Sequence, residues 1–305
     1  MSQTDDHVLA DLQESRRQFL ELVQDIRAEL HRYCTRMTGS AIDGEDVVQD
    51  TLAKAYYELA DLHELPALRA WLFRIAHNRA IDYTRRYERR MNEPIEVATE
   101  LFADETLEPD HAVARQEAVG TAWSGFLELA PVQRSCVILK DVFSYSLDEI
   151  SSMLELSVAA VKSALIRGRA KLREISSALE VDPASRPKVH SAALLRYAAL
   201  FNSRDWEAVR AMLVDDVKLE LVSRMKRSGR SEVSSYFGNY DSIAGWCLVP
   251  AWLEDREVLA VLLDPANPNR PYFIELKITG ERVAGIRDFR YVPYILQEAA
   301  LQLAE

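Results

Sequence analysis

The sequence predicts a multidomain chain in which two all-α domains precede an α+β domain. Residues 14–90 and 116–178 carry apolar side chains at helical spacing. From residue 189 onward the pattern changes to two short helices followed by β-rich runs such as "VKLELV" and "PYFIELKI". Residues 91–115, between the helical stretches, hold seven acidic residues, two prolines and no sustained periodicity, which is typical of a linker.

The composition is that of an ordinary soluble globular protein. Hydrophobic residues make up 48% and charged residues 28% of 305 residues, a length that allows two or three domains. The sequence has neither a long apolar run nor a signal-peptide pattern, so we expect a cytoplasmic protein without a membrane partner. Cys34, Cys136 and Cys247 lie far apart and outside any metal-ligand spacing, so we expect buried free thiols, no metal and no cofactor.

Two cationic segments interrupt a chain whose net charge is −11. Residues 69–90 contain seven arginines against two acids, and residues 162–174 contain five basic residues against one glutamate. Because like charges on a short segment create a local positive potential, these segments indicate binding to a polyanion that the net charge alone conceals.

The first cationic segment belongs to a predicted helical domain. Apolar spacing predicts helices over residues 14–36 and 44–60, with Asp43 as the N-cap of the second. A third helix is expected over residues 67–90, with Trp71 in the core rather than on the surface.

The second cationic segment, "SLDEISSMLELSVAAVKSALIRGRAKLRE", predicts a helix-turn-helix. Ser146 and Glu149 fit a capping box, and Ser157 offers a second N-cap after a break near Leu156. The inner face of the second helix would carry Val158, Val161, Leu165 and Leu172. A helix with exposed cations fits the major groove of DNA, although a solvated basic face has the same spacing. The expected DNA contacts are Ser157, Lys162, Ser163, Arg167, Arg169 and Lys171.

This segment resembles region 4 of the extracytoplasmic-function (ECF) sigma factors, whose usual wording is similar to "YEEIAEILGVPVGTVKSRLHRARARL". Upstream, "DGEDVVQDTLAKAYYEL" and "ALRAWLFRIAHNRAIDYTRR" resemble region 2 of the same family. The resemblance implies that residues 14–90 form region 2, residues 91–115 a linker, and residues 116–178 region 4, which reads the promoter −35 element. The chain departs from the pattern in and after the turn, at Glu155, Ala159, Ala160 and Ala164.

The resemblance also implies roles within region 2. In this family the helix matching "DGEDVVQDTLAKAYY" docks on the RNA polymerase clamp, which makes Asp46, Gln49 and Asp50 the expected polymerase contacts. The cationic helix that follows, with the loop before it, would meet the −10 element through His63, Arg74, Asn78, Arg79, Arg85 and Arg86. Each cationic segment alone would bind DNA weakly, so useful affinity should require core RNA polymerase to hold both.

Residues 189–305, after a second linker at 179–188, resemble SnoaL-like (NTF2-like) domains. The resemblance depends on "LLRYAALFNSRDWEAVRAMLVDDVKLELV", "GRSEVSSYF" and "ITGERVAGIRDFRYVPYI", with a hairpin at Thr279 and Gly280. It implies a cone-shaped α+β domain. We expect its aromatic residues to form the core, namely Trp206, Trp246, Trp252, Tyr236 and Tyr272. Since no His–Asp arrangement is visible, we expect none of its acids to be catalytic, namely Asp216, Glu220, Asp241 and Asp288.

The sequence therefore predicts a sigma factor for promoter recognition and transcription initiation, not an enzyme. The added domain resembles that of a subgroup in which the extension regulates the sigma regions by intramolecular contact, although the "DGGGK" motif of some members is absent. Two alternatives stay open: a ligand-sensing helix-turn-helix repressor and an NTF2-like isomerase or cyclase. The sequence specifies neither the promoter nor any small-molecule ligand.

Overall fold

The computed structural model describes residues 3–59, 68–92, 124–178, 189–241, 245–254, 256–263, 271–299 and 301–303. The chain divides into two compact units, residues 1–180 and 181–305, and each has its own hydrophobic core. Of the linker expected at 91–115, only the first two residues are described, and they continue a helix; the linker at 179–188 and His63 lie outside the described residues.

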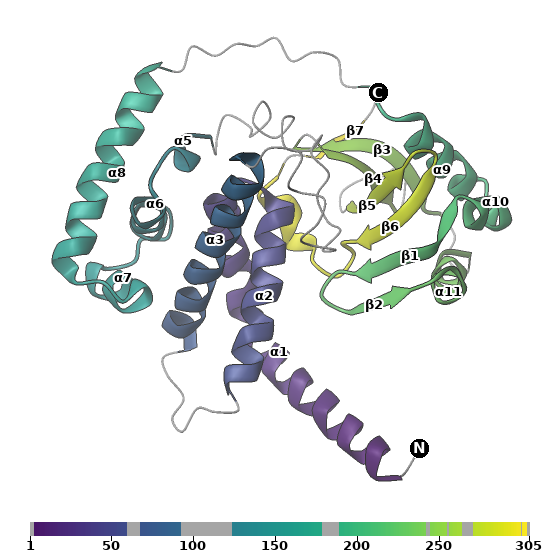
Figure 1. Ribbon diagram of the computed structural model, residues 1–305, viewed down its shortest axis with the longest axis horizontal. Coiled ribbons are helices and arrows are strands. Elements are labelled where there is room, and N and C mark those ends of the chain that lie inside the picture. The colour runs from purple at the N-terminus through teal and green to yellow at the C-terminus, as the bar shows by residue number, and fades with distance from the viewer. Residues whose placement is uncertain are drawn as a thin grey trace. The chain divides into compact units, whose positions relative to one another are not determined.

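The first unit begins with three long helices, α1 (Gln3–Thr38), α2 (Ala41–Leu59) and α3 (Leu68–Asn92) (Figure 1). Helix α1 starts well before the predicted residue 14. The prediction that Asp43 caps α2 is wrong: Ser40 precedes the helix, and its Oγ accepts a hydrogen bond from the Asp43 amide at 3.3 Å. Asp43 instead lies in the first turn, where the helix dipole favours a carboxylate. Trp71 is buried, as predicted.

The second half of this unit contains shorter helices. They are α5 (Ser124–Leu127), α6 (Pro131–Val137), the π-helical turn η1 (Ile138–Val142), α7 (Leu147–Leu154) and α8 (Val158–Ala178). Gly168 of α8 lies against α6, where a Cβ atom would come within 2.8 Å of Val137 Cγ2. Helices of both halves contribute to one core, in which Leu30 and Phe73 share a cluster with Leu139 and Ile150.

The second unit is an α+β domain, which confirms the predicted fold class. Its seven-stranded sheet has the order β2-β1-β6-β5-β4-β3-β7, in which β1 and β6 are parallel and the other neighbours antiparallel. The strands are β1 (Leu213–Leu221), β2 (Met225–Ser228), β3 (Cys247–Leu253), β4 (Arg256–Leu262), β5 (Tyr272–Thr279), β6 (Arg282–Asp288) and β7 (Leu301–Leu303).

Three helices complete this unit by packing on the sheet (Figure 1). They are α9 (Ala192–Asn202), α10 (Trp206–Ala211) and α11 (Arg230–Asp241), and a 3-10 turn, η2 (Pro293–Gln297), follows β6. The predicted hairpin between β5 and β6 is present, and Gly280 supplies the positive φ of 63° that its turn requires. Strands β2, β3 and β7 were not predicted.

The prediction of three buried free thiols is confirmed at two positions. Cys34 and Cys136 are buried free thiols, as predicted, whereas Cys247 is only half-buried. Among the described residues, no helix combines the length and the apolar character that crossing a bilayer requires. The same residues contain no group of three or more histidine, cysteine or acidic side chains arranged to hold a metal ion.

Candidate nucleic-acid interface

The predicted helix-turn-helix is present, and its turn is fixed by specific capping contacts. Ser146 Oγ accepts from the Glu149 amide and the Glu149 carboxylate accepts from the Ser146 amide, which completes the capping box of α7. Glu155 ends α7 with φ 53° and ψ 42°, a left-handed conformation in which glycine is usual. Ser157 then caps α8, because its Oγ accepts from the Ala160 amide at 3.2 Å.

Helix α8 separates an apolar face from a cationic one. Val161, Ala164 and Leu165 are buried, and Val158 and Leu172 are half-buried. The opposite face exposes Ser157, Lys162, Arg167, Arg169 and Lys171, while Ser163 is half-buried. This arrangement fits a helix that packs on its own domain and presents cations to a groove of DNA.

The cations of α8 differ in how they are held. Arg169 Nε donates to Asp141 Oδ2 at 3.0 Å, and Lys171 lies 3.5 Å from Glu174. Within the part of the chain that the structure describes, Lys162 and Arg167 have no carboxylate partner. Among the described residues the charges of Lys162 and Arg167 are therefore not neutralised by a carboxylate, whereas that of Arg169 is paired with Asp141.

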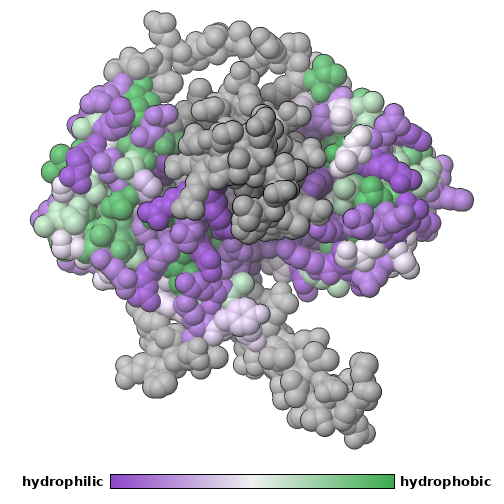
Figure 2. All heavy atoms as spheres, viewed as in Figure 1, coloured by the Kyte–Doolittle hydropathy of each residue, from purple (hydrophilic) through white to green (hydrophobic). Residues whose placement is uncertain are grey.

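One residue of this face was missed by sequence reasoning. Ile166 is 70% exposed and lies between Lys162 and Arg169 along α8. The side of unit 1 that carries α8 mixes hydrophobic and hydrophilic spheres in the space-filling view (Figure 2). An apolar side chain on a groove-facing helix is able to contact a thymine methyl group.

The predicted −10 contacts lie along α3 but in different surroundings. Asn78, Arg85 and Arg86 are exposed, whereas Arg74 and Arg79 are half-buried. Arg74 Nη1 donates to Glu155 Oε1 at 2.6 Å, so this cation is bound to the turn of the helix-turn-helix.

A shallow hollow brings part of the predicted polymerase contact next to part of the predicted −10 contact. Asp50 of α2 and Arg79 of α3 both line it, together with Tyr57. The hollow has a volume of about 480 Å³ and is completed by Ala53, Lys54 and Glu58. Tyr57 is 76% exposed, and sequence reasoning missed it. Asp46 and Gln49, the other two predicted polymerase contacts, are half-buried on α2 outside the lining of this hollow.

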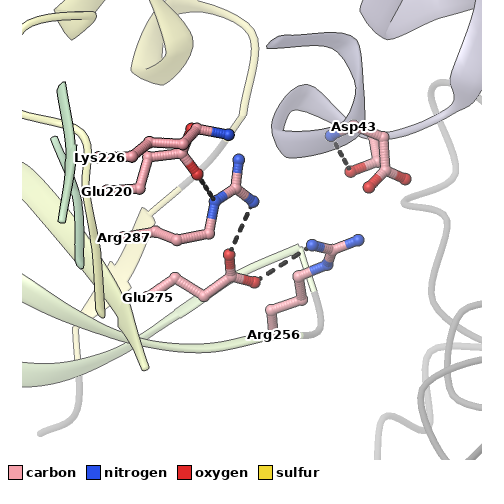
Figure 3. A network of polar contacts seen from close by, with 7 residues as sticks. Asp43, Glu220, Lys226, Arg256, Glu275 and Arg287 are labelled. Atoms are coloured by element: carbon pink, nitrogen blue, oxygen red, sulfur yellow. Dashed lines mark hydrogen bonds and ion pairs between the residues drawn. The ribbon is translucent and has the colours of Figure 1, made fainter. Parts of the chain in front are cut away.

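The four acids considered in the second unit have separate environments. Asp216 is exposed, and Asp241 accepts a hydrogen bond from Trp206 Nε1 at 2.9 Å. Glu220 lies 3.1 Å from Lys226 and 3.1 Å from Arg287. These two ion pairs belong to a cross-strand charge ladder that runs Lys226, Glu220, Arg287, Glu275, Arg256 (Figure 3).

Asp288 is the only one of these four acids that is fully buried. Its Oδ2 accepts hydrogen bonds from the hydroxyls of Tyr236 at 2.9 Å and Tyr240 at 2.8 Å, and Tyr272 bonds to Tyr240 at 3.1 Å. We call these four residues the tyrosine cluster. Burial raises the pKa of Asp288 and of the three phenols. Because every member has a hydrogen-bond partner, the cluster is suited to structural support.

The prediction that the aromatic residues of this unit form its core is confirmed for four of the five and is wrong for Trp252. Trp246, Tyr236 and Tyr272 are buried in its core, and Trp206 packs against that core. Trp252 is half-buried and stacks on His190 with ring centroids 4.8 Å apart.

Comparison with known proteins matches both helical regions to sigma factors. The Sigma-70 region 2 model matches residues 22–90, and the Sigma-70, region 4 model matches residues 126–172. The ECF RNA polymerase sigma factor SigW of Bacillus subtilis is 30% identical over 164 residues, which are 51% of this chain and 87% of SigW. The chain belongs to the ECF RNA polymerase sigma factors.

A second relative and a solved structure also match this sigma factor. The ECF RNA polymerase sigma factor SigG of Mycobacterium tuberculosis is 31% identical over 216 residues, which are 63% of this chain. The chain spans only 58% of the length of SigG. The crystal structure of the Mycobacterium tuberculosis ECF sigma factor SigJ covers 88% of this chain and 95% of its own, at 18% identity and a TM-score of 0.34.

Proposed function

We propose that this sigma factor directs core RNA polymerase to promoters in the cytoplasm. Region 4, at residues 116–178, would read the −35 element through α8, and region 2, at residues 14–90, would bind polymerase and the −10 element. The observation that carries the proposal is the outer face of α8, where a capped helix-turn-helix exposes Lys162 and Arg167 without carboxylate partners among the described residues.

The −35 contact is proposed for the polar residues of α8. Lys162 and Arg167 supply charge for phosphates or base edges, and Ile166 supplies an apolar contact between them. Ser157, Ser163, Arg169 and Lys171 complete the proposed surface.

The −10 and polymerase contacts are proposed for region 2. The exposed side chains of Asn78, Arg85 and Arg86 are placed to follow the backbone of a melted strand. The proposed −10 contacts are Arg74, Asn78, Arg79, Arg85 and Arg86, with His63 before them in the sequence. The proposed polymerase contacts are Asp46, Gln49 and Asp50 of α2.

This assignment is tested by transcription with purified core polymerase over a promoter library. The double variant Lys162→Ala/Arg167→Ala should lower promoter-specific output at least tenfold, since each lost contact costs about 1 to 3 kcal/mol. It should also flatten the salt dependence of promoter binding, because each phosphate contact contributes about 0.9 to that slope. The matched control is Arg282→Ala, which removes an exposed cation from the second unit.

Equal output from the double variant and the control would contradict the assignment. Tight binding of the free protein to duplex DNA as a symmetric dimer would instead support a repressor.

The SnoaL-like domain, residues 189–305, is proposed as a noncatalytic regulator of the sigma regions. A covalent tether gives it an effective concentration of roughly millimolar near them, so even weak contacts would change the population of polymerase-ready molecules. The satisfied hydrogen bonds of the tyrosine cluster support a structural role for Asp288 in this domain. Truncation after residue 185 should change promoter-specific transcription, and unchanged output over a range of protein concentrations would contradict regulation.

A further inference from the structure

The outer face of α8 has an apolar stripe at its centre. Ala159, Ile166 and Ala170 are all exposed, and Ile166 is 70% exposed. Successive residues of a helix turn by about 100°, so these three side chains span only about 40° around the helix axis. They point directly away from the buried Val161 and Gly168 on the inner face. The apolar stripe is therefore the part of α8 that would go deepest into a groove of DNA.

Exposed cations border the apolar stripe on both sides. By the same helical spacing, Lys162 and Arg169 lie along one border, and Arg167 and Lys171 lie along the other. Ser163 lies beside the stripe and is half-buried. A helix in the major groove has a phosphate backbone on each side and base edges in front of its centre. The two rows of cations match the two backbones, which leaves the base edges to the apolar stripe.

The base that suits an apolar side chain in the major groove is thymine. The four bases present hydrogen-bond donors and acceptors there, and the one methyl group among them is the C5 methyl of thymine. The side chain of Ile166 has neither a donor nor an acceptor. Against a donor or acceptor of another base it would displace water without replacing the hydrogen bond, which costs free energy. Against the thymine methyl group it buries apolar surface on both sides of the contact.

The place of Ile166 on α8 carries the inference, not its exposure. Single exposed apolar side chains are common on protein surfaces and by themselves indicate no contact. Ile166, however, has the largest side chain of the apolar stripe and lies near its middle, between the two rows of cations. Contact of Ile166 with a protein surface is the alternative, and such a contact would not depend on the methyl group of a base.

We propose that Ile166 is a specificity-determining residue that selects a thymine in the −35 element through the methyl group of that base. This inference rests on the proposed function, because it concerns the DNA that α8 would read. Burying one methyl group against an apolar side chain is worth about a factor of four in affinity. Removing that methyl group from the DNA, or the apolar side chain from α8, should therefore have the same effect, and removing both should cost no more than removing one.

The test compares promoters that differ by a single methyl group. Transcription with core polymerase and the full chain, over a library randomised in the −35 element, first selects the preferred promoter. Each thymine of its −35 element, on either strand, is then replaced in turn by deoxyuracil, which keeps the donors and acceptors of thymine and lacks only the methyl group. At one of these positions the replacement should weaken promoter binding by the polymerase with its sigma factor about fourfold.

Substitution of Ile166 supplies the second readout. Ile166→Ser should bring the ratio of thymine to uracil affinities at that position to about one, whereas Ile166→Val should keep part of it. The matched control is Val189→Ser, which removes an 81% exposed apolar side chain from the second unit and should leave the ratio unchanged.

Two results would overturn the proposal while leaving the proposed function intact. One is a ratio of about one for the wild-type chain at every thymine of the selected −35 element. The other is a ratio that Ile166→Ser leaves as high as in the wild type. A library from which no promoter is selected would overturn the proposed function and this inference together.

Discussion

The two units each bury a polar cluster, but the clusters connect different kinds of structure. In the second unit, Asp288 of β6 accepts hydrogen bonds from Tyr236 and Tyr240 of α11, so a strand and a helix of the same domain are joined. In the first unit, residues 1–180, which we call the sigma unit, the side chains of Tyr33 in α1, His77 in α3 and Ser135 in α6 are hydrogen-bonded to one another. They lie in segments matched by the region 2 model and the region 4 model. The first cluster includes a carboxyl group, while the second contains neutral groups alone. The difference is that one cluster joins a strand to a helix of one domain, whereas the other joins helices from both halves of the sigma unit.

The largest effect is expected from a substitution that breaks the tyrosine cluster of the second unit. Asp288→Ala leaves two phenol hydroxyls and the Arg290 amide without their acceptor, so we expect a loss of about 4 kcal/mol from the unfolding free energy of that unit. Denaturant unfolding, followed by hydrogen exchange in β5 and β6, measures it. Asp216→Ala is the control, since an exposed carboxylate should change stability by less than 0.5 kcal/mol. A loss below about 1 kcal/mol would show that the tyrosine cluster is not structural.

The next effect sharpens the comparison through pH. The pKa of His77, lowered by burial to about 4, means that below pH 6.5 the unfolded chain binds a proton that the folded chain does not. The unfolding free energy of the sigma unit should therefore fall as pH drops from about 6.5 to 4, by roughly 3 kcal/mol in all and about 2 kcal/mol between pH 7 and 5. Denaturation curves at both pH values measure it. His77→Gln should remove this part of the pH dependence. If the unfolding free energy of the variant falls with pH as steeply as that of the wild type, His77 is not its source.

A smaller effect is expected from replacing one helix glycine by alanine in each unit, which compares how tightly the two helices pack. Gly168→Ala places a methyl group 2.8 Å from the buried Val137, so the sigma unit should lose about 1 to 2 kcal/mol despite the better helix propensity of alanine. Gly238→Ala is the same change in α11, where no atom outside the helix's own backbone lies within 4 Å of the added Cβ atom. It should stabilise the second unit by up to about 1 kcal/mol. Thermal unfolding of the two variants should shift in opposite directions, and shifts of the same sign would contradict this account of both sites.

The smallest effect concerns the turn of the helix-turn-helix. Glu155→Gly relieves a left-handed backbone and should stabilise region 4 by about 1 kcal/mol relative to Glu155→Ala. Both variants remove the ion pair to Arg74, so their difference isolates the backbone. Equal unfolding midpoints for the two variants would mean that the turn carries no strain.

Much of this fold was predictable from the sequence because its signals are local. The capping box at Ser146 and Glu149 and the N-cap at Ser157 lie within three residues of the groups they bond. Strand β3 was not predicted, because Pro250 interrupts it. Among the residues that the structure describes, β7 pairs with Ala251, Trp252 and Leu253 of β3 and not with Pro250, and Pro250 lies opposite Leu259 of β4.

The polar clusters were not predictable because their members lie far apart in the chain. Tyr33 and Ser135 are separated by 102 residues, and Tyr236 and Asp288 by 52. Asp288 was considered as an acid, but no spacing paired it with a tyrosine. For the same reason the sequence placed Arg74 on a DNA-facing stripe without indicating that Glu155 binds it.

The cross-strand charge ladder also limits how the second unit is able to assemble. Glu220 lies opposite both Lys226 and Arg287, and Glu275 lies opposite Arg287, so the alternating signs fit one alignment of four neighbouring strands. Sliding any of these strands by one residue would turn its charged side chain toward the apolar face beneath the helices. Misaligned sheets would then bury an unpaired charge, whose cost in free energy favours the native alignment.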